Sequence, residues 1–549
     1  MENKIGKIIK KRIIIIGILL SIIFMILSSR LYYLQVNKKD EYTLNAMKQR
    51  GKEFSIYPNR GTIFDRHLKP ITNNELTHTI IIEKKLLIED QELYDKVIKS
   101  TSLDHEELNE EVHRSKDLLQ IPLKNINLFD YDDNRFFIVD TVKRYSKGNP
   151  LAHVIGYTSK SDNVGESGIE EVHNEFLSTE KKTSFMVEYD RDRSMILGGG
   201  YYVNQNENIN NPSGVKLTVD LDIQNIVEKT LDAERLNGAV VVSEVKSGDI
   251  LALASRPNFN QDNVDISFTS KDTPLFNKAI RVGYPPGSIF KIVVLLSALE
   301  ENPEIKNDEF YCPGYEEVNG ERFKCSSVHG KISIEEAFAK SCNSVFIQLG
   351  RKTGPQNIIN MAKKLGFGSK IDIGLSEEIA GTLPQDDETL GAAIGNISIG
   401  QDKLEVTPLQ ASNLLTILAN KGIKKDLSIV KGITNKDGKI IKDYFKEDDH
   451  RIIDKRSAEY ILDRLRDVVQ FGTASSMDLD NHGGAGGKTG SAEGVLNRQY
   501  VVHGWFSGFY PSMNPKYIIT VLIEDSDTGS LRALPVFETI AKSIYKNNL

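Results

Sequence analysis

The stretch Tyr284-Pro285-Pro286-Gly287-Ser288-Ile289-Phe290-Lys291 decides the fold of the region around it. Its prolines and glycine interrupt one element, and the apolar run that follows predicts a helix that begins at Ser288. Lys291 lies three positions later, so its amine shares one helix face with the Ser288 hydroxyl. A serine is a poor nucleophile unless a base lies within hydrogen-bond reach, and a helix N-terminus adds positive potential and free N–H groups. The stretch therefore predicts an activated serine.

Two later segments supply polar groups that suit the same site. Ser341-Cys342-Asn343 follows a helical run and can place a hydroxyl and an amide in a shared cleft. Lys488-Thr489-Gly490-Ser491 follows the glycine-rich loop Gly483 to Gly487. A second Lys-Thr-Gly at 352–354 precedes a proline and is typical of a helix end. Ser-x-x-Lys also starts at five other serines, so the Ser288 motif gains its meaning from the other two segments.

The elements around these motifs predict an α+β domain with a mainly antiparallel sheet. A β-hairpin is expected at 238–245 and 250–254, where β-branched runs flank a short polar turn. Helical sequence dominates 288–420, and strand patterns return at 501–509 and 517–524. Strands at both ends of a helical middle indicate one sheet with helices packed against it.

The N-terminus predicts a membrane anchor. Lys4 to Arg12 is basic, and the uncharged run Ile13 to Ser29 that follows could form a helix of roughly 25 Å, which interfacial tyrosines would extend. A cleavable signal peptide is the alternative, but Ser28-Ser29-Arg30-Leu31 is a poor cleavage site. We expect residues 1–12 in the cytoplasm, a retained single-pass anchor at 13–33, and the rest of the chain outside.

The remaining chain is expected to form two domains. Residues 34–213 carry charged helical patches and short strands without evident chemistry, and we interpret them as an elongated pedestal. The glycine run at 198–200 and the polar stretch from Asn204 to Gly214 predict the boundary. Residues 214–549 would form the catalytic domain.

Charge and cysteine content limit the partners. The formal charge is -7 and the pI about 5.9, which does not favour nucleic-acid binding.

Cys312 and Cys325 lie close together in a segment rich in turns, and the sequence leaves open whether they form a disulfide. Cys342 is interpreted as a small buried residue. No histidine has His-x-x-x-His spacing and no cysteine pair has Cys-x-x-Cys spacing, so we expect no metal and no cofactor.

Taken together and in this order, Ser288-x-x-Lys291, Ser341-x-Asn343 and Lys488-Thr489-Gly490 resemble the signature of penicillin-binding proteins and serine β-lactamases. Upstream, Arg60 to Arg66 and Gly168-Ile169-Glu170 resemble the membrane-proximal motifs of class B penicillin-binding proteins, which are monofunctional peptidoglycan D,D-transpeptidases. The chain has His67-Leu68 where the first motif usually continues with an Asn-Gly turn. We interpret Arg60, Asp65 and Arg66 as structural residues.

The resemblance implies a role for each motif residue. Lys291 would accept the Ser288 proton, its proton affinity lowered by burial and by the charge of Lys488, and Ser288 would attack the penultimate D-Ala. Backbone N–H groups of Ser288 and Ser491 would form the oxyanion hole. Ser341 would relay a proton and Asn343 would hold the stem peptide. The terminal carboxylate would bind Lys488, Thr489 and Ser491, while Gly490 would leave room for the substrate.

The same resemblance implies stem peptides as substrates, β-lactams as inhibitors, and a polytopic glycosyltransferase as a membrane partner. Two other functions stay open. A D,D-carboxypeptidase or β-lactamase would use the same Ser288 and Lys291, although no glutamate-based deacylation motif is evident. A non-catalytic scaffold or β-lactam sensor would keep the pocket without turnover. The sequence also leaves open whether the chain serves elongation, division or sporulation.

Overall fold

The computed structural model describes residues 2–549 except 40, 43–44, 46–50, 56–59, 102, 116–117, 131–132, 134, 160–162, 179–183, 189–200, 205–213, 436–437, 445, 447–448 and 497–498. The chain divides into two compact units. Unit 1 comprises Met1–Asn59, Thr77–Thr141 and Glu180–Ile209, and unit 2 comprises Arg60–Leu76, Val142–Thr179 and Asn210–Leu549. Most of the predicted boundary, at 198–200 and 205–213, lies outside the described residues, and the predicted domain limits stay predictions.

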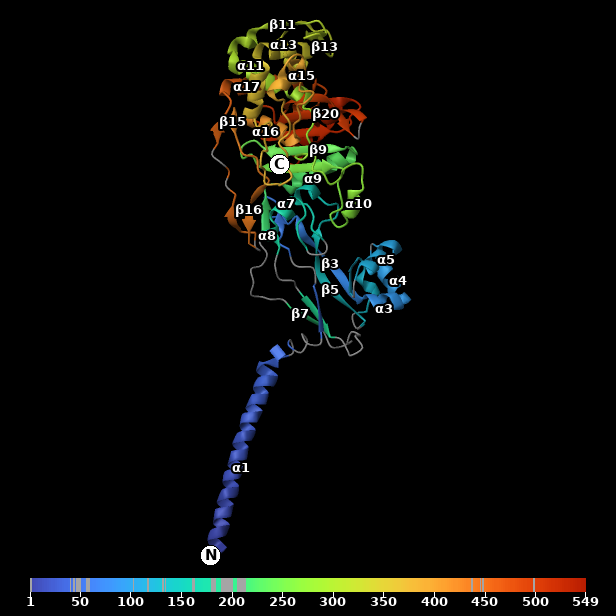
Figure 1. Ribbon diagram of the computed structural model, residues 1–549, viewed down its shortest axis with the longest axis vertical. Coiled ribbons are helices and arrows are strands. Elements are labelled where there is room, and N and C mark those ends of the chain that lie inside the picture. The colour runs from blue at the N-terminus through green and yellow to red at the C-terminus, as the bar shows by residue number, and fades with distance from the viewer. Residues whose placement is uncertain are drawn as a thin grey trace. The chain divides into compact units, whose positions relative to one another are not determined.

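Unit 1 begins with the long helix α1 (Glu2–Tyr32), which continues into a π-helical turn at Tyr33–Asn37 (Figure 1). Within the described residues, Ile5–Asn37 is the one helical stretch long and apolar enough to cross a membrane. None of its most apolar window is buried against protein. A helix with this many uncovered isoleucines and leucines needs a non-aqueous environment, which agrees with the predicted anchor.

The folded part of unit 1 packs three helices against a small sheet. The sheet order is β4-β3-β5, and a second sheet has the order β1-β6-β7. The helix α5 starts with a capping box between Asp104 and Glu107. The predicted strand at 79–82 lies within β3, and the charged helical segment contains α4 and α5. The elements are β1 (Gly51–Ser55), β3 (Thr72–Glu83), α3 (Lys84–Glu89), α4 (Gln91–Ser100), α5 (His105–Arg114), β4 (Leu118–Leu123), η2 (Ile126–Leu128), β5 (Phe136–Tyr145), β6 (Ser184–Glu188) and β7 (Tyr201–Asn204).

The centre of unit 2 is a five-stranded antiparallel sheet with the order β10-β9-β21-β20-β19 (Figure 1). Its strands come from both ends of the 214–549 segment, as the sequence predicted, and the α+β fold is confirmed. The hairpin expected at 238–254 forms β9 (Gly238–Glu244) and β10 (Ile250–Arg256). The later strands are β19 (Gly486–Leu496), β20 (Gln499–Tyr510) and β21 (Tyr517–Ile523). β19 lies at one edge, so one side of this strand is free of the sheet.

Helices cover the sheet on both faces. Asp220 caps α9 (Leu221–Ala233), which packs on β10 and against α18 (Ala533–Lys546). α16 (Pro408–Ala419) packs on β9, β20 and β21, where its Ser412 lies 3.1 Å from Ser243 of β9. Because neighbouring residues of a strand point to opposite faces, the apolar residues of β9 pack against the helices on both faces of the sheet.

A helical region follows β10. It is built around α11, whose residues Lys291–Leu299 are all buried. The predicted helix end at Thr353–Gly354 is confirmed, since Gly354 is the C-cap with φ +86. The elements are α10 (Asp265–Phe268), η3 (Gly287–Ile289), α11 (Lys291–Glu301), η4 (Pro303–Asn307), β11 (Glu309–Cys312), β12 (Tyr315–Val318), β13 (Glu321–Lys324), β14 (Gly330–Ser333), α12 (Ile334–Ala339), α13 (Asn343–Thr353), α14 (Pro355–Lys364), η5 (Asp386–Thr389), α15 (Ala393–Ile399), α17 (Lys455–Gln470), η6 (Asp480–His482) and η7 (Gly529–Arg532).

The rest of unit 2 joins upstream residues to the 214–549 segment. β2 runs parallel to β8 in a sheet with the order β17-β16-β8-β2, and β15 pairs with β18. The elements are β2 (Ile63–Phe64), α6 (Ala152–Ile155), α7 (Gly168–Val172), α8 (Asn174–Leu177), β8 (Gly214–Leu217), β15 (Ile423–Lys424), β16 (Val430–Thr434), β17 (Ile440–Asp443) and β18 (His450–Arg451).

The upstream charged motif has a structural role in this region. Arg60 is buried and its guanidinium donates to the Glu170 carboxylate, which also accepts a 2.7 Å hydrogen bond from Arg144. Asp65 accepts hydrogen bonds from two backbone N–H groups, and Leu68 (φ +65) forms the turn that an Asn-Gly pair would usually make. The interpretation of Arg60 and Asp65 as structural residues agrees with these contacts.

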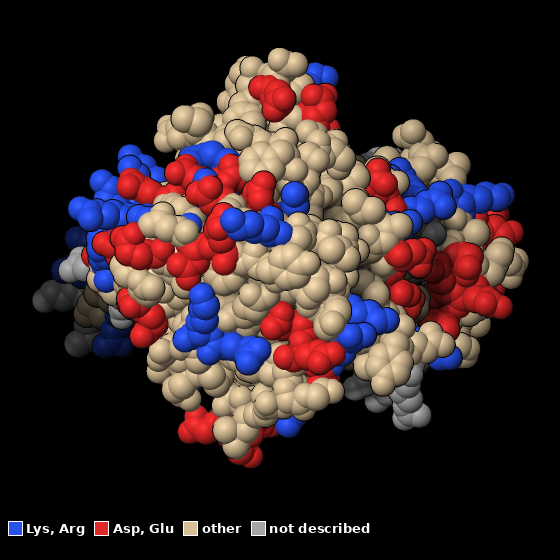
Figure 2. Space-filling model, turned by 90° about the horizontal axis from the view of Figure 1, so that it is seen from above, with Lys and Arg blue, Asp and Glu red and all other residues tan. Residues whose placement is uncertain are grey.

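On the face seen in Figure 2, basic and acidic side chains are interspersed.

Candidate active site

Ser288 lies in the 3₁₀ turn η3, immediately before α11. Gly287 adopts φ +52 and donates its N–H to the carbonyl oxygen of Gly400 at 2.8 Å, which fixes the turn from outside. The Ser288 side chain is half-buried, whereas Ile289 and Phe290 are fully buried. The structure therefore confirms that Ser288 lies at the start of a helical segment, with the α-helix proper beginning at Lys291.

Gly287, Gly400 and Gly490 allow the backbones around Ser288 to approach closely. A Cβ atom at Gly287 would lie 2.8 Å from the carbonyl oxygen of Ser491. A Cβ atom at Gly400 would lie 2.2 Å from the carbonyl oxygen of Gly287. A Cβ atom at Gly490 would lie 2.9 Å from the carbonyl oxygen of Pro286 and 3.1 Å from the side chain of Trp505. A glycine is needed at position 490 because β19 packs directly against the turn that carries Ser288. The resemblance had implied that Gly490 leaves room for the substrate.

Ser341 is the residue at which the three predicted motifs meet. Its hydroxyl donates to Ser288 Oγ at 2.8 Å and accepts from Lys291 Nζ at 3.2 Å and from Lys488 Nζ at 3.1 Å. Ser341 has φ +56, a left-handed conformation that is uncommon for a residue other than glycine. Strained backbone of this kind occurs where the surrounding structure fixes a functional side chain. Stretches from 288, 341 and 488 therefore form one hydrogen-bonded group.

Both lysine amines of this group are buried. Burial lowers the pKa of Lys291 to about 8, an effect partly offset by the nearby Cys342 and Cys325. Burial, and then the positive charge of Lys291, hold the pKa of Lys488 well below its usual range. We expected the charge of Lys488 to lower the pKa of Lys291, whereas in the structure the charge of Lys291 lowers the pKa of Lys488. Because two adjacent buried positive charges repel each other, a proton on one amine disfavours a proton on the other.

Asn343, Thr489 and Ser491 make contacts within the protein. Asn343 Oδ1 accepts from Lys291 Nζ at 2.7 Å, and its amide nitrogen donates to the carbonyl oxygen of Lys324 at 3.0 Å. The Thr489 hydroxyl lies 2.6 Å from that of Thr473, and Ser491 Oγ accepts the N–H of Ser530 at 3.0 Å. Asn343 thus holds the lysine amine, a role that the sequence analysis did not assign to it.

A surface hollow of about 430 Å³ adjoins this group. Thr473, the partner of Thr489, lies on its wall. The wall is formed by Ser326, Ser327, His329, Lys340, Phe471, Gly472 and Thr473. Thr489 itself is buried, so the hollow meets the hydrogen-bonded group through Thr473.

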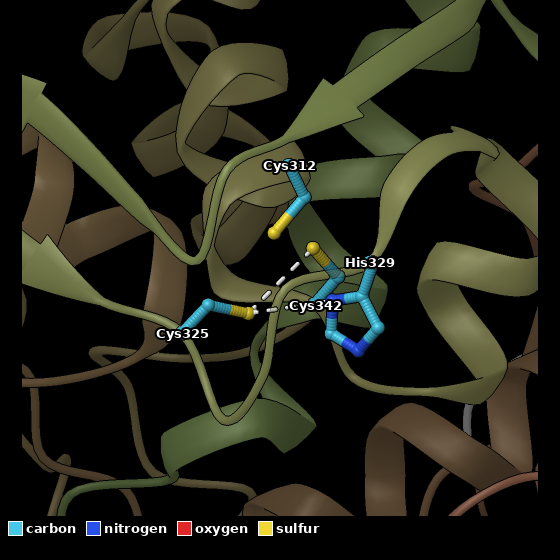
Figure 3. A group of neighbouring side chains, drawn as sticks. All are labelled: Cys312, Cys325, His329 and Cys342. Carbon is cyan, nitrogen blue, oxygen red and sulfur yellow. Dashed lines mark hydrogen bonds between the residues drawn. The ribbon is translucent and has the colours of Figure 1, made fainter.

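A second cluster of side chains, which the sequence did not predict, lies next to the site. Cys312, Cys325, His329 and Cys342 point toward one another (Figure 3). All three cysteines are free thiols, so Cys312 and Cys325 do not form the disulfide that the sequence left open. Cys342 is completely buried, as expected, but it packs against sulfur atoms. The spacings of 12, 3 and 12 intervening residues contain neither His-x-x-x-His nor Cys-x-x-Cys, so these patterns do not indicate the cluster.

Two family descriptions match the chain. Residues 238–546 match the penicillin-binding protein transpeptidase domain, and residues 55–196 match the penicillin-binding protein dimerisation domain. Stage V sporulation protein D of Bacillus subtilis is 26% identical over 95% of this chain and 83% of its own length. Peptidoglycan D,D-transpeptidase MrdA of Haemophilus influenzae is 26% identical over 93% and 88%. Among solved structures, penicillin-binding protein PBP2 of Helicobacter pylori in complex with MreC has a TM-score of 0.66 and 21% identity, covering 90% of this chain and 99% of that one.

Proposed function

Because the chain belongs to the penicillin-binding protein transpeptidase family, we propose that it is a class B peptidoglycan D,D-transpeptidase that cross-links stem peptides through an acyl-enzyme on Ser288. β-Lactams acylate the same hydroxyl as mimics of D-Ala-D-Ala. The observation that carries this function is the hydrogen-bonded group in which Ser341 joins Ser288 to Lys291 and Lys488.

Acylation begins with the loss of the Ser288 proton. Ser341 Oγ lies 2.8 Å from Ser288 Oγ and 3.2 Å from Lys291 Nζ. Once Lys291 is neutral, the two hydroxyls turn so that Ser288 donates to Ser341 and Ser341 donates to Lys291. The proton then passes from Ser288 to Ser341 while Ser341 gives its own proton to Lys291. The negative carboxylate of the substrate beside Lys488 favours the charged form of that amine. The single proton of the lysine pair therefore moves to Lys488, and Lys291 becomes the neutral base.

The attack of Ser288 Oγ on the penultimate D-Ala carbonyl forms a tetrahedral intermediate. Backbone N–H groups of Ser288 and Ser491 stabilise its oxyanion, by about 3 kcal/mol for each donor in comparable sites. As the C–N bond breaks, Lys291 returns the proton through Ser341 to the departing D-Ala amine. An amine of a second stem then attacks the ester, and its proton passes through Ser341 to Lys291. As the ester C–O bond breaks, Lys291 returns that proton by the same route to Ser288 Oγ, which regenerates the hydroxyl.

The other motif residues position the reactants. Asn343 orients the Lys291 amine through its side-chain oxygen. A stem-peptide carbonyl would reach the Asn343 amide nitrogen by replacing its exposed bond to Lys324. Thr489 and Ser491 flank Lys488 on β19, where they contribute to binding of the terminal carboxylate. The bond from the Ser530 N–H to Ser491 Oγ orients that hydroxyl.

The location follows from α1 and the substrate. Stem peptides lie outside the cytoplasmic membrane, so α1 serves as a single-pass anchor with the folded units on the outer side. A polytopic glycosyltransferase that makes the glycan strand is the proposed membrane partner. The complex of the Helicobacter pylori protein with MreC supports a place for this chain in a wall-synthesis assembly.

The proposed acyl-enzyme is tested by detecting a covalent penicillin adduct on Ser288. The full chain in detergent is incubated with a penicillin, its intact mass is measured, and the adduct is mapped to a peptide. We expect one adduct on Ser288, no adduct on Ser288→Ala, and an unchanged adduct on Ser297→Ala, which changes a buried serine of α11, the helix that follows Ser288. An adduct that is released within seconds would favour the hydrolase, and no adduct at Ser288 would refute the function.

A further inference from the structure

The four side chains of Cys312, Cys325, His329 and Cys342, which we call the thiol cluster, come from three separate segments. Cys312 ends β11, Cys325 and His329 lie between β13 and β14, and Cys342 lies between α12 and α13. Figure 3 shows the three sulfur atoms and the imidazole facing a common centre. Their ligand atoms all lie within 4.8 Å of one another, although the residues span thirty positions of sequence.

These distances suit one tetrahedral ion. In a zinc site with Zn–S bonds of about 2.3 Å, neighbouring sulfur atoms lie about 3.8 Å apart. Cys325 Sγ lies 3.7 Å from Cys342 Sγ and 3.7 Å from His329 Nδ1. Three thiolates and one imidazole form one of the donor sets of structural zinc sites, and softer ligands of this kind disfavour Mg²⁺ and Ca²⁺.

The surroundings of His329 support ligation through Nδ1. Its other nitrogen, Nε2, lies 3.0 Å from Ser327 Oγ, so the ring can donate there while Nδ1 faces the sulfurs. A ligating histidine usually donates its second ring N–H to such a partner, which fixes the tautomer. Cys312 and Cys342 are fully buried, whereas Cys325 and His329 are half-buried, so an ion could enter from that side.

We propose that the thiol cluster binds one Zn²⁺ ion, which holds the Ser341–Asn343 segment in its active geometry. Each ligating thiol loses its proton to solvent as the ion binds. Cys342 is the residue between Ser341 and Asn343, so a bond to Cys342 restrains both neighbours. The ion connects this segment to β11 and to the 325–329 loop, which follows the Lys324 carbonyl that Asn343 already contacts. The left-handed φ of Ser341 requires a restraint of this kind.

Zinc content is measured independently of activity. The full chain in detergent is purified, dialysed against metal-free buffer and weighed by native and by denaturing mass spectrometry, with elemental analysis in parallel. We expect one zinc per chain in the native spectrum. His329→Ala and Cys325→Ser should lose it, while His113→Ala, an exposed histidine of α5, should keep it. Co²⁺ in place of zinc should give thiolate-to-metal absorption and the visible bands of a tetrahedral ion.

The second measurement links the ion to the site and rests on the proposed function. Chelator-treated protein should melt several degrees lower and react with labelled penicillin at least about tenfold more slowly, and added Zn²⁺ should restore both. Absence of zinc from freshly purified protein that also fails to take up Zn²⁺ or Co²⁺, or a disulfide in the non-reduced protein, would overturn the site. Unchanged acylation after zinc removal would overturn its positioning role. Zinc bound to a chain that penicillin never acylates would support the site and reject the transpeptidase.

Discussion

Removal of the Ser341 hydroxyl tests the proton route most directly. Ser341→Ala deletes the group that lies 2.8 Å from Ser288 Oγ and accepts from both lysine amines. Ser341→Gly deletes the same group and also relieves the left-handed backbone, because glycine adopts φ +56 without a steric cost. The two variants should therefore differ in stability and agree in reactivity.

The expected loss of reactivity follows from the contribution of positioned proton transfer to the rate. Positioned proton transfer contributes about 10²- to 10⁴-fold in comparable enzymes, equal to roughly 3–5 kcal/mol of activation free energy. We expect both variants to lose that factor in the second-order rate constant for penicillin acylation. Ser341→Gly should be as stable as the unsubstituted chain or more so, by up to about 1 kcal/mol, and Ser341→Ala should not gain this stability.

The assay is stopped-flow acylation with a fluorescent penicillin, combined with chemical denaturation. Ser344→Ala is the matched control, since its buried hydroxyl lies three positions later and bonds to Glu316 at 3.0 Å. That variant should acylate normally and lose about 1 kcal/mol of stability. If either Ser341 variant acylates within threefold of the unsubstituted chain, the proton does not pass through Ser341 and Lys291 must act on Ser288 directly.

Three further outcomes are expected. The second-order acylation rate should fall as the pH rises through about 8, because the reactive free enzyme carries the one proton of the lysine pair on Lys291, whose pKa burial lowers to about 8, and the substrate carboxylate draws that proton to Lys488; a rate that keeps rising from pH 6 to 9 would contradict this. Glu170→Ala should destabilise the chain by about 3–5 kcal/mol in denaturant titrations, because it leaves the buried Arg60 uncompensated, and a loss below 1 kcal/mol would show that water reaches that ion pair. Gly490→Ala should lose about 1–3 kcal/mol and acylate slowly, since its Cβ would displace Pro286; normal acylation would mean that β19 can shift freely.

Much of the fold could be predicted because local signals were strong. The hairpin at 238–254, the Asp220 cap and the helix end at Gly354 follow from short-range rules of strand pairing and capping. The meeting of the segments at 288, 341 and 488 could not follow from such rules, since it is a tertiary contact. The resemblance to a known family supplied that expectation, and the hydrogen bonds of Ser341 to Ser288 and Lys488 agree with it.

The local environments of the site residues were harder to predict. Lys291 and Lys488 are both fully buried, and which of them has its pKa lowered by the charge of the other depends on their surroundings in the folded chain, about which spacing contains no information. The contact of Gly490 with Pro286 and the bond from Asn343 to Lys324 likewise depend on packing. The thiol cluster was missed for the same reason, because its ligands lie on separate elements that only the folded chain brings together.

The close packing of the backbone at three glycines limits the substitutions by which β-lactam resistance can arise. Gly287, Gly400 and Gly490 leave no space for a methyl group where three backbones meet at the reactive serine. Bacteria under β-lactam selection therefore gain nothing from changes at these positions, which would harm wall synthesis as much as inhibition. Heritable tolerance in this enzyme should accumulate instead in residues that touch the antibiotic but leave that junction intact, and sequencing of resistant isolates would find the three glycines invariant.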